Sequence, residues 1–440
     1  MLENVAFGLD KALSPFKSLF LTKTHPVSHK AISYIRGLFK SEKNRANCTS
    51  ISDTLGEFDH QSINHLLTES PWSYSEVLEE LSLRASDMFN RDQGEVGLLI
   101  DEVGFRKKGK SSACVGRQYL GGIGKHDNGQ VAVVAGLSQD RHYCPVDVRL
   151  FMPEDWQDDH QRREKARIPD YIHHQTKPQM ALQMIKDLKQ RGVCFDYLGF
   201  DALYGTSFEL IGSLNNEGIL FIGDSRDNVR IYLKEPVFAV PDKPAGTPGR
   251  SYKRPVADQP TSTLREYGDT LNLEDDFEQI AFRDGSKQRI RAYFHQKQVW
   301  ICTDQHKGTL LKLQLIIRKD PDGTVKYSFC NMHTETLPQI AARQGQRVFV
   351  ERIFEEGKNE IGMGDYQVRS WEGFHKHITL CFLAFYYVAV QKVHHHECLP
   401  LTASVIRKLV AATIISRWES LDSTMELCMQ QLARYHCQIQ

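Results

Sequence analysis

The sequence lacks an excess of charge of either sign. Lys and Arg number 55 and Asp and Glu number 55, so the formal net charge is zero. This excludes the strongly basic balance of many nucleic-acid binders, and any DNA binding must come from local basic groups. Such groups occur at Arg106 to Lys110, at Arg162-Arg163 and at Arg250 to Arg254. Charge runs more often mark a solvated face, so each group alone is weak evidence for phosphate contact.

The sequence also lacks long apolar runs and paired cysteines. The longest apolar run, Ile378 to Val390, is shorter than the roughly 18 residues that a membrane span needs, so we expect a buried helix and no membrane partner. No N-terminal stretch resembles a signal peptide, and the 10 cysteines include no C-x-x-C pair. These absences favour a protein of the reducing cytoplasm.

The chain has enough apolar residues for more than one domain. Its 440 residues are 41% hydrophobic, which predicts two or three folded domains. Apolar residues at helical spacing in Ala31 to Phe39 and in Tyr74 to Met88 predict a helical N-terminal domain. Apolar residues at helical spacing occur again from Leu337 and continue, with breaks, to the end of the chain.

The pattern of apolar residues changes at Gly94. The apolar run Val96 to Ile100 predicts a buried strand that Asp101 ends, and a second strand is expected to end at Asp201. Both aspartates are therefore expected at the C-terminal ends of central strands, where sites form in open α/β sheets. Alternating strands and helices predict a parallel sheet segment. The other expected strands are 130–137, 146–152 and 219–223, and the expected helices are 178–190 and 207–215.

A β-rich region follows. Residues 234–275 are rich in Pro, Gly, Ser, Thr and charge, which predicts a long loop. Hairpin turns are expected at Asp284-Gly285 and at Asp322-Gly323. The expected strands are 277–282, 289–294, 299–303, 311–318 and 325–330. Together these features predict an all-β insertion.

Two aspartates at strand ends could hold Mg²⁺ or Mn²⁺ if a third carboxylate joined them. Glu351 is the best candidate, because on a helix it lies about 40° around from Arg347 and about 20° from Lys358. A carboxylate for metal beside cations for phosphate suits phosphoryl transfer. The alternatives are an ordinary surface Arg-Glu pair and aspartates that only cap turns.

Several separated motifs, in order, resemble a known family. The chain resembles DDE-class insertion-sequence transposases, in particular insertion-sequence family seven-hundred-and-one, which is related to the larger family-four superfamily. The resemblance runs from about Tyr34 to about Val390. The matching stretches are residues 34–38, Pro71-Trp72, 100–110, 116–119, 143–156, 176–178, 201–205 and 366–371.

The resemblance implies roles for particular residues. It makes Asp101, Asp201 and Glu351 the catalytic acids and the ligands of two Mg²⁺ or Mn²⁺ ions. The wider superfamily's signature around the last acid is Tyr, Arg, Glu and Lys; Arg347, Glu351 and Lys358 fit it, whereas Gln344 stands at the tyrosine position and Val103 where Thr or Ser is common. Arg347 and Lys358 would hold phosphates near the cut. Lys107, Lys108 and Lys110 would bind flanking DNA.

The resemblance also implies an α/β fold with a ribonuclease-H-like catalytic core, in which the first and fourth strands are neighbours, so that Asp101 and Asp201 share a metal. We predict five segments. These are a helical DNA-end-binding domain (1–92), the first part of the core (93–233), the β-rich insertion (234–335), a helical completion of the core with Glu351 (336–393) and a helical tail (394–440).

The predicted function is that of a DNA transposase, a metal-dependent endonuclease that cuts and joins strands at insertion-sequence ends. Its expected partners are double-stranded DNA, as terminal inverted repeats and target, and a second copy of the chain in a homodimer on DNA. We expect it in the bacterial cytoplasm, at the nucleoid when bound to DNA. The alternatives are a catalytically inactive DNA-binding protein derived from a transposase and a metal-dependent nuclease that does not join strands.

Overall fold

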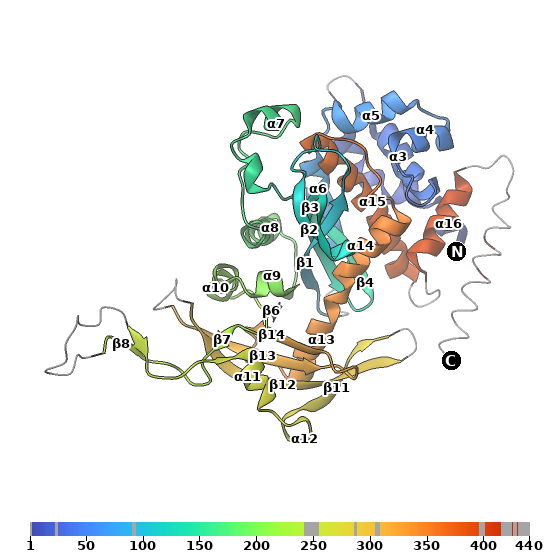
Figure 1. The fold of residues 1–440 in the computed structure, drawn as a ribbon. Coiled ribbons are helices and arrows are strands. Elements are labelled where there is room, and N and C mark those ends of the chain that lie inside the picture. The colour runs from blue at the N-terminus through green and yellow to red at the C-terminus, as the bar shows by residue number, and fades with distance from the viewer. Residues whose placement is uncertain are drawn as a thin grey trace. The chain divides into compact units, whose positions relative to one another are not determined.

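The computed structural model describes residues 2–22, 25–89, 94–241, 255–285, 288–303, 309–395 and 401–414, and positions 425 and 429. The chain forms two compact units: unit 1 combines residues 1–195 with 348–440, and unit 2 contains residues 196–347. Figure 1 shows the helices and strands, most of them labelled. The five segments expected from the sequence remain predictions.

Unit 1 contains the N-terminal and C-terminal helices of the chain. Its N-terminal elements are α1 (Leu2–Phe7), α2 (Leu9–Ala12), η1 (Ser14–Phe20), α3 (Ser28–Lys40), α4 (Cys48–Leu55), α5 (His60–Thr68) and α6 (Tyr74–Met88). After its strands come η4 (Glu154–Trp156), α7 (His160–Lys165) and α8 (Lys177–Arg191). The C-terminal helices are α14 (Val348–Glu360), α15 (Trp371–His395) and α16 (Ala403–Thr413). The helices expected at 31–39 and 74–88 and after Leu337 are therefore present, whereas most of the predicted tail (394–440) lies outside the described residues.

Helix α15 is the centre of the helical part of unit 1. Nearly all its residues from Trp371 to Ala389 are buried, which confirms the buried helix expected for the apolar run 378–390. Helices α3, α5 and α6 pack against it, and α1 and α3 pack against α16. A hydrogen bond of 2.8 Å joins Tyr34 Oη to His377 Nδ1. Among the described residues, no helix is both long enough and apolar enough to cross a membrane.

The sheet of unit 1 is antiparallel. Strand β3 (Lys125–Gln139) pairs with β1 (Gly97–Arg106), β2 (Gly116–Leu120) and β4 (His142–Leu150). The short helix η3 (Gly121–Ile123) connects β2 to β3. One prediction is wrong: β1 continues beyond Asp101 to Arg106, because its pairing with β3 persists and Val103 and Phe105 are buried. Asp101 therefore lies in the middle of its strand, opposite Val134.

Helix α14 lies on this sheet and contacts β1, β3 and β4. Gly136, opposite Leu99 of β1, allows the close approach, because a Cβ there would clash with Ile353 Cδ1. Further along, Lys358 Nζ donates to Gly104 O at 2.9 Å. The helix thus runs alongside β1 in the same direction, from the level of Leu99 to that of Gly104.

Unit 2 has a mixed sheet with the strand order β11-β12-β13-β14-β6-β5. Strands β5 (Tyr197–Phe200) and β6 (Phe221–Ser225) are parallel, which confirms the predicted parallel segment, and the other pairs are antiparallel. The remaining strands are β7 (Arg230–Ile231), β8 (Phe238–Ala239), β9 (Val256–Ala257), β10 (Ser262–Thr263), β11 (Glu278–Asp284), β12 (Arg289–Ile301), β13 (Leu311–Lys319) and β14 (Val325–Cys330). The helices are α9 (Ala202–Gly205), α10 (Phe208–Asn216), α11 (Leu264–Asp269), α12 (Leu273–Asp276) and α13 (Leu337–Gln346).

The β-rich region differs from its prediction in two ways. The two strands expected at 289–294 and 299–303 are one strand, β12, because β13 pairs with it continuously from Tyr293 to Ile301 across the polar residues between them. The region is also not all β, since it contains the short helices α11 and α12. The expected turn at Asp322-Gly323 is present, with Gly323 at a φ of +87°.

Candidate metal centre and phosphate contacts

Asp101 and Glu102 are neighbours on β1 of unit 1. The backbone N–H of Glu102 donates to Asp101 Oδ1 at 2.7 Å, which fixes the orientation of that carboxylate. Lys177, at the start of α8, forms an ion pair with Glu102, with 3.0 Å between Nζ and Oε1. Both carboxylates are partly buried. Unit 1 therefore supplies two adjacent carboxylates, one of which has a lysine partner.

Asp201 follows β5 directly and caps helix α9 of unit 2. Its Oδ1 accepts a hydrogen bond of 2.8 Å from the backbone N–H of Leu203. Gly205, the last residue of the motif at 201–205, must be a glycine because a Cβ there would clash with Asp224 O on β6. The predicted position of Asp201 at the C-terminal end of a buried strand is thus confirmed. A backbone donor orients this carboxylate, as one orients Asp101.

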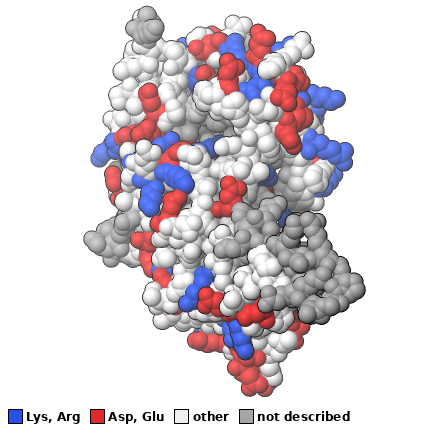
Figure 2. Space-filling view, turned by 90° about the vertical axis from the view of Figure 1, so that its left-hand side faces the viewer, with Lys and Arg blue, Asp and Glu red and all other residues white. Residues whose placement is uncertain are grey.

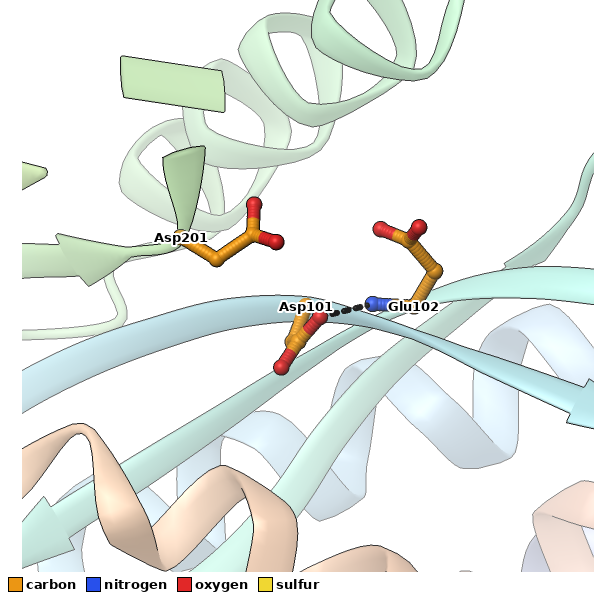
Figure 3. A group of neighbouring side chains, drawn as sticks. All are labelled: Asp101, Glu102 and Asp201. Atoms are coloured by element: carbon orange, nitrogen blue, oxygen red, sulfur yellow. Dashed lines mark hydrogen bonds between the residues drawn. The ribbon is translucent and has the colours of Figure 1, made fainter. Parts of the chain in front are cut away.

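Among the described residues, the acidic group of candidate metal ligands consists of Asp101 and Glu102 in unit 1 and Asp201 in unit 2, which Figure 3 draws. The sequence pointed to the two aspartates but missed Glu102. Side chains alternate between the faces of a strand, so Glu102 is expected on the face opposite Asp101. The only signal for it was its place next to Asp101.

Glu351, the expected third ligand, lies in the first turn of α14 and is exposed. It is not a member of the acidic group above. Helix α14 includes both Glu351 and Lys358, so the two share a helical stripe as expected. Its role as a ligand stays a prediction.

Arg347 and Gln344 belong to unit 2. Arg347 lies between helices α13 and α14 and forms an ion pair with Asp224, with 3.3 Å between Nε and Oδ2. Gln344, at the superfamily's tyrosine position, is buried and donates to Ser328 Oγ at 2.7 Å. Its Oε1 accepts from Arg318 Nη1 at 3.2 Å. The amide thus has a structural role in which it donates and accepts through two separate atoms, whereas a phenol has a single oxygen for both bonds.

Two of the lysines expected to bind phosphate, Lys358 and Lys107, lie near the end of β1 in unit 1. Lys358 Nζ lies 5.5 Å from the centre of the Phe105 ring. Lys107 Nζ lies 3.3 Å from the centre of the Tyr366 ring and donates to Tyr366 O at 3.2 Å. Burial lowers the pKa of both lysines, that of Lys107 to about 7 although Asp365 opposes the shift. Both ammonium groups are therefore poorly hydrated.

The other basic groups have different surroundings. Lys108 and Lys110 are exposed, as a flanking DNA contact requires. Arg163 is buried and donates to four backbone carbonyls, those of Gln157, Pro169, Asp170 and Ile172, so its role is structural. The group at residues 250–254 lies outside the described residues. On the face drawn in Figure 2, basic and acidic side chains are interspersed, in keeping with zero net charge.

Comparisons with known proteins agree with the predicted family. Residues 24–289 match the family model described as DDE superfamily endonuclease, a range that includes Asp101 and Asp201 but ends before Glu351. The chain is 32% identical over 365 residues to the "Probable transposase for insertion sequence element IS701" of Microchaete diplosiphon, which covers 82% of this chain and 81% of that protein.

A structural comparison gives a weaker likeness. The piggyBac transposase, solved as a synaptic complex with hairpin DNA, aligns with 99% of this chain and 82% of its own, at 10% identity and a TM-score of 0.41. The resemblance inferred from the motifs is confirmed by the family model and by the relative. The chain belongs to the DDE superfamily endonucleases, and among them to the insertion-sequence transposases related to that of IS701.

Proposed function

We propose that this transposase cuts and joins DNA strands at insertion-sequence ends by two-metal phosphoryl transfer in a ribonuclease-H-like core. Asp101, Asp201 and Glu351 are the proposed metal ligands. The observation that supports this most is that both aspartates lie within the family match and that each has one carboxylate oxygen oriented by a backbone N–H. Both belong to the acidic group drawn in Figure 3.

The chemistry of these donors fits a hard divalent cation. Carboxylate oxygens are the ligands that Mg²⁺ and Mn²⁺ prefer, and this acidic group contains no sulfur or nitrogen ligand that would favour a softer metal. A hydrogen bond to one oxygen of each aspartate limits rotation of the carboxylate, which favours a fixed ligand geometry. When bound, the ions would lower the pKa of a water or 3′-hydroxyl nucleophile and stabilise the leaving oxygen.

The protein's own residues would position the DNA. Lys358 has three N–H donors and gives one to Gly104 O, so others remain for a phosphate oxygen. Arg347 has Asp224 as its partner, and a phosphate would compete with that carboxylate or share the guanidinium with it. Glu102, paired with Lys177, would supply a supporting negative charge beside Asp101.

The proposed partners are double-stranded DNA, as terminal repeats and target, and a second copy of the chain. The proposed place of action is the bacterial cytoplasm. In this proposal the helices of residues 1–92 recognise the ends of the element, because they precede the core and offer helices that could enter a groove.

The test is a reaction of the purified protein with duplexes that contain the element's own ends. With Mg²⁺ or Mn²⁺ we expect strand cleavage and then transfer of the 3′-hydroxyl end to target DNA, and with EDTA neither. Cleavage without joining would support a nuclease instead. Specific binding without cleavage in either metal would support a catalytically inactive DNA-binding protein.

A further inference from the structure

A groove of about 540 Å³ lies in unit 1 at the end of strand β1. Helix α5 contributes His60 and Asn64 to its lining, the segment after β1 contributes Lys107, and the segment before α15 contributes Tyr366 and Arg369. No aspartate or glutamate lines the groove. Its charged lining is therefore cationic.

The two cations of the groove have no ion-pair partner among the described residues, although Asp365 acts on Lys107 without forming an ion pair. In the part of the chain that the structure describes, neither Lys107 nor Arg369 forms an ion pair. Lys107 is partly buried, and its ammonium donates to the carbonyl oxygen of Tyr366 and lies over the ring of that residue. Removing an ammonium group from water without an ion-pair partner is unfavourable, and an anion in the groove would offset that cost.

The groove continues a row of cations along β1. The rings of Phe105 and Tyr366 pack edge to face, with 5.6 Å between their centres. Lys358 lies over the first ring and Lys107 over the second. Asp101 and Phe105 are four residues apart in β1 and so face the same side of the strand, and Lys107 follows its last residue, Arg106. From the catalytic aspartate toward the end of β1, the order is thus carboxylate, Lys358, Lys107 and groove.

We propose that this groove binds backbone phosphates of the same duplex that the active site cuts. The inference rests on the proposed function for its choice of DNA as the anion. Lys107 is six positions beyond Asp101, which in a strand is about 20 Å, and a duplex lying along β1 covers that length in about six base pairs. The groove therefore fixes the duplex about six base pairs from the reacting phosphate, and Asn64 and His60 offer further polar contacts.

The test measures affinity for a 30-base-pair duplex by fluorescence anisotropy at several KCl concentrations. Lys107→Met and Arg369→Met are each expected to weaken binding and to reduce the slope of log affinity against log salt by about 1, because each removes one phosphate contact. Lys189→Met, which removes an exposed lysine of α8, is the matched control and should leave the slope unchanged. An unchanged slope in both groove variants would overturn the proposal.

A stability measurement separates phosphate binding from a structural role. Lys107→Met should raise the Tm of the DNA-free protein, because it replaces a desolvated ammonium with an apolar side chain. A lowered Tm together with weaker binding would instead mean that Lys107 supports the fold, and the proposal would be wrong.

A second measurement locates the contact. Duplexes with one uncharged methylphosphonate linkage should bind the native protein less tightly when that linkage lies about six base pairs from the cut, and Lys107→Met should not discriminate against them. Equal discrimination by the variant would place the contact elsewhere. Asp101→Ala should keep the native salt dependence of binding. The two proposals can therefore fail separately: the cleavage rate tests the metal site, and the salt dependence of DNA binding tests the groove.

Discussion

At the scale of single residues, the chain places two lysines where they are poorly hydrated and form no ion pair with any described residue. Lys107 and Lys358 each contact an aromatic ring and a backbone carbonyl of unit 1. Such an arrangement costs stability in the free protein, and it is typical of side chains that receive an anionic ligand.

We predict that DNA binding depends on pH through Lys107, whose pKa is lowered to about 7. Phosphates stabilise the charged ammonium and raise its pKa in the complex, so affinity should fall as pH rises from 6 to 8. The charged and titratable groups around it are Asp365, Arg369, His60 and His377. Anisotropy titrations at constant salt measure this dependence.

The Lys107→Met variant should lose most of that pH dependence, and His60→Gln controls for the imidazole in the same groove. If Lys107→Met keeps the native pH profile, another group is responsible.

The three proposed ligands give a second prediction. Asp101→Ala, Asp201→Ala and Glu351→Ala should each abolish metal-dependent cleavage and leave folding and DNA binding nearly intact, because each removes a ligand and little packing. Glu355→Ala is the matched control, since Glu355 is an exposed carboxylate one turn from Glu351 with a surface partner, Arg352. Retained cleavage in any one of the three variants would remove that residue from the site.

Glu102 gives a third prediction, because it belongs to the acidic group and Glu351 does not. Its negative charge is already balanced by Lys177, so we expect it to support Asp101 rather than to bind metal itself. Glu102→Gln should therefore slow cleavage but retain measurable activity, in contrast to Asp101→Ala. Single-turnover cleavage rates at saturating Mg²⁺ measure the difference, and complete loss in Glu102→Gln would make Glu102 the third ligand.

At the scale of elements, the positions of Glu351 and Lys358 depend on how closely α14 approaches the sheet of unit 1. The closest point is at Gly136, which has no side chain to separate β3 from Ile353. Asp201 depends in the same way on Gly205, where α9 lies against β6. In each unit, a glycine thus allows the close packing on which the position of a predicted site residue depends.

We predict that Gly136→Ala destabilises the protein by about 1–3 kcal/mol through overpacking and slows cleavage by displacing α14. The clash is with Ile353 Cδ1, the one atom that Ile353→Val removes. The double variant should therefore be more stable than Gly136→Ala alone, although Ile353→Val alone should cost about 0.5–1.5 kcal/mol. Urea unfolding measures all three, and additive losses would contradict this contact.

At the scale of the whole molecule, the two ends of the sequence share one core. Helices α3, α5 and α6 cover α15, and buried contacts such as Tyr34 with His377 and Tyr74 with His375 join them. With a net charge of zero, the molecule must bind DNA through local features, such as the row of cations on β1, rather than through an overall field.

Deletion of residues 1–90 is therefore expected to expose the apolar surface of α15 and to unfold or aggregate unit 1. Circular dichroism and size-exclusion chromatography would show this. A folded, monodisperse product would contradict the shared core. A role of these helices in end recognition is better tested by exchanging exposed residues of α4 and α5 in the full chain.

The sequence alone determined much of the fold and the family. Local spacing predicted the terminal helices, the buried strand before Asp101, the parallel pair around Asp201 and the buried helix at 378–390, because these patterns reflect the periods of helices and strands. Ordered motifs such as those at 100–110 and 201–205 indicated the family, and with it Asp101 and Asp201.

Only the tertiary structure decided the surroundings of those residues. The continuation of β1 beyond Asp101 depends on pairing with β3, and the joined strand β12 depends on pairing with β13, neither of which is encoded in a short window of sequence. The ion pair of Glu102 with Lys177, the aromatic rings under Lys107 and Lys358, and the partner of Arg347 join residues far apart in the chain. Burial and charge balance are properties of such long-range contacts, and so they appear only once the chain has folded.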